Sequence, residues 1–133
     1  MKTLPIRLTP SQDLRGALEA AVAAQGCAAG FVLSGIGSLA QACVRLAGAD
    51  DAPARSADFE ILTLAGTIAP NGSHLHATLA DADGKVFGGH VAPGCIVRTT
   101  AEVLVALLDD WAFSREPDAA TGYAELVVRR KQE

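Results

Sequence analysis

The chain has 133 residues, of which half are apolar and a fifth are charged, and its formal net charge is −4. This composition excludes a disordered or fibrous protein, and the length suits one domain, which we expect to span residues 1–133. The apolar stretches are shorter than the ~20 residues of a membrane-spanning helix, and residues 1–10 lack the apolar run of a secretory signal. We therefore expect a cytoplasmic protein without membrane contact.

The acidic balance also bears on partners, because nucleic-acid binding proteins need a basic surface to neutralise phosphates. The tightest basic cluster is Arg129-Arg130-Lys131, which we interpret as a solvated tail. The three cysteines, Cys27, Cys43 and Cys95, are far apart and lie in apolar sequence. They are typical of reduced core residues rather than of a disulfide framework.

The first half of the chain predicts a strand, a helix and a second stretch of strand. Lys2–Leu8 reads as an edge strand because it contains Pro5. Residues 11–25 carry apolar side chains at helical spacing, and Gly26 supplies the stop. Phe31–Leu33 then predicts a buried strand, followed by a glycine-rich bend at 34–39, a strand-like segment at 40–46 and an exposed loop at 47–57. The glycine spacing matches no phosphate-binding motif, so we interpret the bend as a close backbone approach.

The second half predicts three antiparallel strands, a second helix and two final strands. Residues 59–68 favour a strand, and Pro70-Asn71-Gly72 turns the chain into the next one. Thr99 and Glu102 match a capping box at the start of a helix that runs to about Asp110. Residues 111–113 and 123–128 read as strands. The expected fold class is therefore α/β of the α+β type, a mostly antiparallel sheet with two flanking helices.

The stretch from Ser73 to Ala92 holds all three histidines and predicts a β-hairpin. Asp81 followed by Gly84 is typical of a three-residue loop that ends in a G1 bulge. This loop pairs His76 with His90 and puts His74 on the same face, opposite an apolar face of the hairpin. A two-residue loop would instead pair His76 with Val91 and split the histidines between faces.

The predicted register makes His74, His76 and His90 a candidate metal site. Three neutral imidazoles suit zinc and leave a fourth position for water or substrate, although the spacing does not exclude nickel, iron or copper. Gly88 and Gly89 would leave room beside the site for an ion, a ligand or another backbone. The alternative is a set of histidines that are hydrogen-bonded at an interface or pocket without metal.

Two further residues, Glu60 and Thr78, are candidates to assist this centre. A three-histidine zinc can activate water, so a zinc-dependent hydrolase-like enzyme is one alternative function. Glu60 would then be a ligand or general base, and otherwise a paired structural charge. The sequence contains no nucleophile elbow and no cofactor fingerprint, so simple metal or ligand binding ranks above catalysis.

Several blocks follow one another in the order of a known family. They are Gly37-Ser38-Leu39, Phe59-Glu60-Ile61-Leu62, His74-Leu75-His76, Asp83-Gly84 with Gly88-Gly89-His90, and Thr100-Ala101-Glu102-Val103. In this combination the chain resembles the plants-and-prokaryotes conserved domain, PPC or PCC. The resemblance covers nearly the whole chain.

The resemblance implies an α/β sandwich that assembles as a homotrimer. Similar plant domains follow AT-hook segments in nuclear proteins that bind A·T-rich DNA, and bacterial relatives often carry a DNA-binding label. This chain has no Arg-Gly-Arg-Pro hook, and Ala57-Asp58 stands where the plant domains have Gly-Arg before Phe59. We therefore expect a self-associating metal-binding or small-molecule-binding module, with DNA binding as an alternative function.

Overall fold

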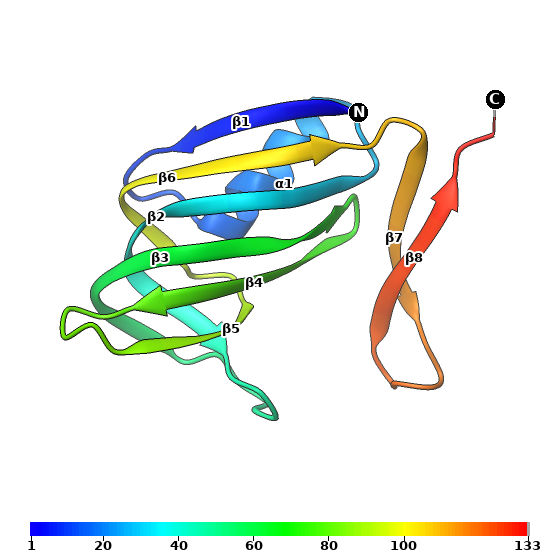
Figure 1. Ribbon diagram of the computed structural model, residues 1–133. Coiled ribbons are helices and arrows are strands. Elements are labelled where there is room, and N and C mark those ends of the chain that lie inside the picture. Colours follow the sequence, from blue (N-terminus) through cyan, green and yellow to red (C-terminus); the bar gives the residue numbers. More distant parts are fainter. Residues whose placement is uncertain (133) are drawn as a thin grey trace.

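A computed structural model describes residues 1–132 of the chain as a curved antiparallel sheet with one helix and a separate two-stranded ribbon (Figure 1). The large sheet has the strand order β1-β6-β2-β3-β4-β5, and β7 pairs with β8 alone. The elements are β1 (Lys2–Leu8), α1 (Leu14–Ala24), β2 (Gly30–Arg45), β3 (Ala54–Ala69), β4 (Gly72–Ala80), β5 (Val86–Val91), β6 (Ile96–Leu107), β7 (Trp111–Pro117) and β8 (Ala124–Arg130).

The helix covers the inner face of the sheet behind β1, β6 and β2 (Figure 1). Leu14, Leu18 and Val22 lie on one side of the helix, as their spacing predicts, and each is buried. The helix begins at Leu14 rather than near Ser11, because Asp13 is the N-cap and accepts a hydrogen bond from the Gly16 amide at 2.8 Å. Its other carboxylate oxygen accepts from the Gly94 amide and so joins the helix to the chain that follows β5.

The sheet curls far enough that its edge strand returns to its middle. The 16-residue strand β2 pairs with β6 on one side and β3 on the other, and its last residues also pair with β5. Val44 lies opposite Val91, and Arg45 lies opposite His90. Gly37 permits one of the bends, since a Cβ there would lie 2.4 Å from the Thr100 carbonyl oxygen. The glycine-rich segment is thus part of a continuous strand.

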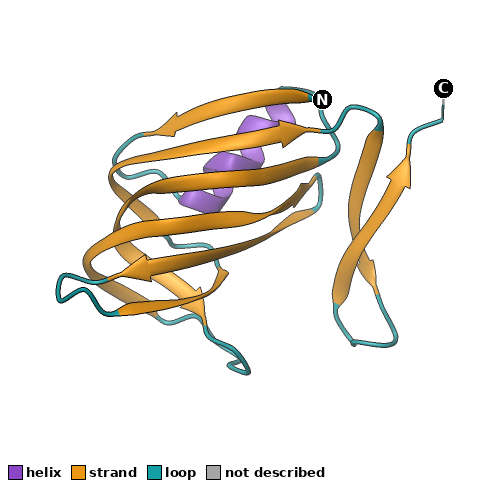
Figure 2. Cartoon of the chain, in the orientation of Figure 1, coloured by secondary structure: helices purple, strands orange, loops and turns teal. Residues whose placement is uncertain are grey.

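The prediction of a second flanking helix over residues 99–110 is wrong, and with it the α/β fold class. Residues 99–107 form most of β6, and the described residues are mostly antiparallel β with a single 11-residue helix (Figure 2). Ala101, Val103 and Val105 are buried while Glu102 and Leu104 are not, which is the period of two of a strand. Thr99 does not cap a helix. Its hydroxyl forms a 2.6 Å hydrogen bond with the Ser38 hydroxyl, and its backbone amide donates to the same Ser38 oxygen at 3.1 Å.

The three cysteines are free and buried, as predicted. Cys43 and Cys95 lie side by side, because the Cys95 thiol donates to the Cys43 carbonyl oxygen at 3.3 Å. Nothing helical in residues 1–132 has the length and hydrophobicity that a membrane crossing requires.

Candidate metal centre

The histidine hairpin has the predicted register. His76 lies opposite His90, Thr78 opposite Gly88 and Leu79 opposite Phe87. The Asp81 carboxylate accepts hydrogen bonds from the backbone amides of Asp83 and Lys85, both at 2.9 Å, and Gly84 takes a φ of 78°. This turn chemistry fixes the loop at three residues and therefore keeps the three histidines on one face.

The three imidazoles converge on one point. Each offers a nitrogen, and these nitrogens lie within 4.8 Å of one another. The Nε2 atoms of His74 and His76 are 3.0 Å apart, and the ring centroids of His74 and His90 are separated by 5.3 Å. Nitrogen ligands of a tetrahedral zinc stand about 3.3 Å apart, given Zn–N bonds of 2.0–2.1 Å. The His74–His76 pair is already close to this spacing, and the more widely separated nitrogens would have to approach by up to about 1.5 Å to hold such an ion.

The surroundings of His74 and His90 lower the pKa of both side chains and so favour the neutral form that metal binding requires. Burial, followed by the charge of His76, lowers the pKa of His74. Burial, followed by the charges of His74 and Arg45, lowers the pKa of His90 to about 4. Nδ1 of His90 is buried and has no hydrogen-bond partner among the described residues. A buried ring nitrogen without a hydrogen-bond partner is suited to coordinate a cation through its lone pair.

A polar chain from the helix reaches the cluster, and sequence reasoning missed it. Arg15 Nη1 lies 3.5 Å from Nε2 of His90 and donates to the Val91 carbonyl oxygen at 3.3 Å. Arg15 Nε pairs with Glu19 at 2.9 Å, and Glu19 in turn accepts from the Ser73 hydroxyl. The i, i+4 spacing of Arg15 and Glu19 predicts their pairing with each other but not their contact with a hairpin far along the chain.

The two residues expected to assist the metal centre, Glu60 and Thr78, lie outside the histidine cluster. Glu60 is opposite Ser38 and Ala80, and it lines a pocket with Arg98 and Thr99 rather than with the histidines. Thr78 shares the histidine face but lies one cross-strand position farther on, opposite Gly88. Neither residue belongs to the group of side chains that can hold an ion.

Gly88 and Gly89 are positions of close backbone approach. A Cβ at Gly88 would lie 2.5 Å from the Ala77 carbonyl oxygen, and one at Gly89 would lie 2.3 Å from the Arg45 carbonyl oxygen. Gly88 therefore lets β5 pair tightly with β4, and Gly89 lets it pair tightly with β2. The two glycines hold the strands together beside His90.

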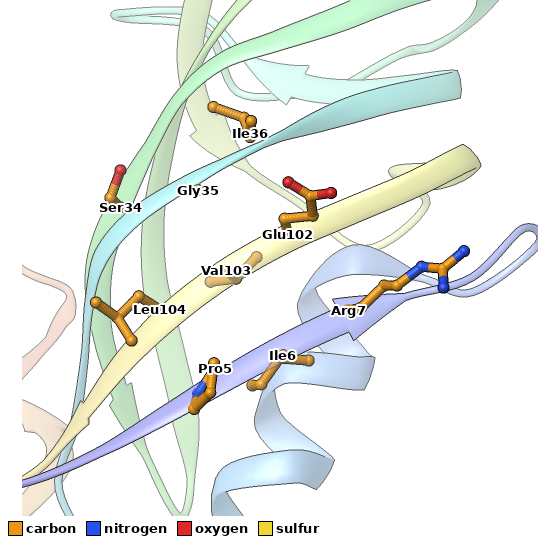
Figure 3. A pocket seen from close by; sticks show the side chains of 9 residues that line it. All are labelled: Pro5, Ile6, Arg7, Ser34, Gly35, Ile36, Glu102, Val103 and Leu104. Atoms are coloured by element: carbon orange, nitrogen blue, oxygen red, sulfur yellow. The ribbon is translucent and has the colours of Figure 1, made fainter.

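Besides the pocket that Glu60 lines, two more hollows of the described sheet lie on its outer face. One, of about 320 Å³, is beside the cluster and is lined by Phe31, Ala65, Gly66, Thr67, His74 and His76. The other, of about 540 Å³, lies over β1, β6 and β2 and is mainly apolar (Figure 3). Its lining residues are Pro5, Ile6, Arg7, Ser34, Gly35, Ile36, Glu102, Val103 and Leu104. Exposed apolar side chains continue along the sheet at Phe31, Leu33, Ile36, Leu62 and Leu104.

A comparison with protein families shows to which family the chain belongs. The sequence model of the Plants and Prokaryotes Conserved (PCC) domain matches residues 1–109, from β1 to the end of β6. The chain belongs to the PCC domain family. The resemblance that the sequence motifs indicated is confirmed. The ribbon of β7 and β8 lies beyond the matched residues.

Solved structures of similar proteins share the fold of this PCC chain. A protein from Salmonella enterica, described as hypothetical, has a TM-score of 0.94 and 35% identity, with 98% of this chain and 95% of that chain covered. A metal-containing protein from Archaeoglobus fulgidus has a TM-score of 0.79 and 26% identity, with 96% and 94% covered. A protein from Bacteroides thetaiotaomicron, described as a candidate DNA-binding protein, has a TM-score of 0.82 and 21% identity, with 94% and 91% covered.

Among curated proteins, the PCC chain is similar to a part of two longer cyanobacterial proteins. It is 49% identical over 129 residues to the Bifunctional protein GlmU of Synechococcus sp. strain JA-2-3B'a(2-13), and 47% identical over 133 residues to that of strain JA-3-3Ab. Nearly all of this chain is covered, 97% and 100%, but only 20% and 21% of those proteins. The chain therefore spans about a fifth of the length of these relatives.

Proposed function

We propose that this PCC protein binds a divalent metal ion, most readily zinc, through His74, His76 and His90. The convergence of three imidazoles on one point, with nitrogens within 4.8 Å of one another, carries the proposal. Three imidazoles leave one tetrahedral position open, so the centre can take an added ligand. The description of the Archaeoglobus fulgidus neighbour as metal-containing supports it.

The bound ion would supply a Lewis-acid centre at the outer face of the sheet. The described residues provide no general base next to the cluster, since Glu60 lies in another pocket. We therefore place ligand binding above hydrolysis. The match to about a fifth of two GlmU proteins supports the role of a module that can be joined to a longer protein.

We propose in addition that the protein forms a homotrimer through the outer face of its sheet. Five large apolar side chains are exposed there, with Leu33 50% and Ile36 53% accessible. Several large exposed apolar side chains on one face of a sheet are typical of a subunit contact. A monomeric mass by light scattering at micromolar protein concentration would refute this part of the proposal.

The description of one structural neighbour suggests DNA binding as another function. The charges of this chain support it less well than metal binding. The basic residues at the end of β8 are mixed with acids, because Arg129 pairs with both carboxylate oxygens of Glu116. Arg130 and Lys131 line one hollow with Asp109 and Asp110. A surface of this mixed sign does not concentrate phosphates.

Metal content per chain tests the proposal directly, by plasma mass spectrometry on untagged protein purified without chelators. We expect about one ion per chain in the unaltered protein and a loss of stoichiometric metal in His76→Ala. Since His76 is exposed, this variant should keep its fold, which circular dichroism checks. A protein that contains no metal and takes up no added zinc would contradict the proposal, as would full retention of metal in His76→Ala.

A further inference from the structure

Arginines surround the histidine cluster. Arg15 from α1 places Nη1 at 3.5 Å from His90, and Arg45 on β2 is the cross-strand partner of His90. Arg115 on β7 packs against Gly72, with its Cγ 3.5 Å from where a Cβ would lie, and its charge acts on His74. The three arginines come from three different elements. The Arg15 guanidinium reaches the cluster itself, whereas those of Arg45 and Arg115 donate to the carbonyl oxygens of Ala49 and Ala124.

Two of the three arginines have a carboxylate beside them, and Arg45 has none among the described residues. Glu19 pairs with Arg15, and Glu125 lies 3.8 Å from Arg115 Nη2. The cluster itself, among the described residues, contains histidines only. A divalent ion held by neutral imidazoles would keep its full charge of +2, and the nearby guanidinium groups would oppose its binding. An anion in the open coordination position removes this repulsion, so ion and anion should bind cooperatively.

Arg15 has the geometry to hold such an anion. Its Nε is occupied by Glu19, which fixes the plane of the guanidinium, while Nη1 makes only two long contacts, to Val91 at 3.3 Å and to His90 at 3.5 Å. Long hydrogen bonds of this kind are weak and easily exchanged. A carboxylate would offer the guanidinium a shorter, charge-assisted bond in their place.

The hollow beside the cluster favours a carboxylate with an apolar body over inorganic phosphate. Phe31, Ala65 and Gly66 line it next to His74 and His76, and its volume is about 320 Å³. We infer that the metal-loaded cluster binds a small apolar carboxylate, with one oxygen on the ion and the other on Arg15. This inference rests on the proposed metal site.

The test uses the full chain loaded with Co²⁺, whose visible absorption reports changes in coordination. Benzoate, acetate and inorganic phosphate are titrated into the loaded protein as probes. We expect benzoate to change the spectrum at lower concentration than acetate, and phosphate to require the highest concentration. In Arg15→Gln, the dissociation constant of benzoate should rise about tenfold or more, as expected for loss of one charge-assisted hydrogen bond.

Metal affinity in the absence of carboxylate separates this role from a purely structural one. Removal of the positive charge should make Arg15→Gln bind Co²⁺ several-fold more tightly than the unaltered protein. If Arg15 only positions His90, the variant binds Co²⁺ more weakly instead. Arg45→Gln is the matched control, because Arg45 is also close to His90 but donates to the Ala49 carbonyl oxygen; its benzoate affinity should change little.

The outcomes are distinguishable from failure of the metal proposal. A protein that takes up no Co²⁺ contradicts the metal site itself. Normal Co²⁺ uptake without any spectral response to carboxylates overturns the inference alone. An equal benzoate affinity in Arg15→Gln and the unaltered protein overturns it too, as does phosphate binding more tightly than benzoate.

Discussion

Replacement of Gly88 by alanine tests whether close strand approach holds the histidine hairpin together. The added Cβ would lie 2.5 Å from the Ala77 carbonyl oxygen, well inside the 3.0 Å that real Cβ contacts respect, so β4 and β5 must separate by roughly half an ångström. The obstacle is backbone, which cannot rotate away. Overpacking costs about 1–3 kcal/mol, and a weakened cross-strand hydrogen bond adds about 1 kcal/mol. We expect Gly88→Ala to lower the free energy of unfolding by about 2–4 kcal/mol.

The assay is urea unfolding of the metal-free protein, followed by zinc titration of the folded variant. Zinc affinity should fall about tenfold, because separation of the strands moves His90 away from His76. Gly84→Ala is the control in the same hairpin: nothing lies within 4 Å of its Cβ, and only its φ of 78° opposes the change. It should cost about 1–2 kcal/mol and leave zinc affinity unchanged. A loss below about 1 kcal/mol in Gly88→Ala, with normal zinc affinity, would refute the reasoning.

Two further predictions follow from pKa values. The pKa of His90 is lowered to about 4 in the folded protein. Between about pH 6.5 and pH 4 the unfolded chain therefore binds a proton at His90 that the native state does not bind. The metal-free protein should lose stability as the pH falls through this range. Urea midpoints across that range measure it; His90→Gln should flatten the slope, and an unchanged slope in that variant contradicts the assignment. Burial raises the pKa of the Cys95 thiol to about 11, so Ellman's reagent should label it only after unfolding, whereas rapid labelling of native protein would show that it is accessible.

The hairpin could be predicted from sequence because its determinants are local. The turn chemistry of Asp81 and Gly84 set the loop length, and the period of two then set which side chains share a face. These rules do not depend on the rest of the fold. The pairing of His76 with His90 followed from counting alone.

The second helix was wrongly predicted because residues 99–107 satisfy two periods at once. Val103, Leu104 and Leu107 fit a helical stripe, whereas Ala101, Val103 and Val105 fit the buried side of a strand. Tertiary context decides between them. Both neighbours of β6, β1 and β2, offer unpaired backbone groups that only a strand can satisfy.

The part of the site that the sequence did not reveal depends on contacts between distant segments. Arg15 reaches His90 because α1 packs across the inner face while the sheet curls β5 back onto β2. Glu60 was expected near the histidines because its strand neighbours theirs. Counting back from the turn at Gly72 already places Glu60 beyond the far end of β4, and the bulge between Ile61 and Thr63 shifts it by one residue, to lie opposite Ala80.

The pairing of β1 with β6 has a consequence for how the protein is made. Leu8 pairs with Ala101 and Lys2 with Leu107, so the first strand has no partner until nearly the whole sheet has been synthesised. Closing such a long loop is entropically costly, and folding dominated by distant pairs is slow. A nascent chain leaving the ribosome would therefore carry an exposed β1, and the edge of β6 that it covers forms only after Leu107 has emerged. The strand β1 should therefore be among the last parts of the sheet to dock.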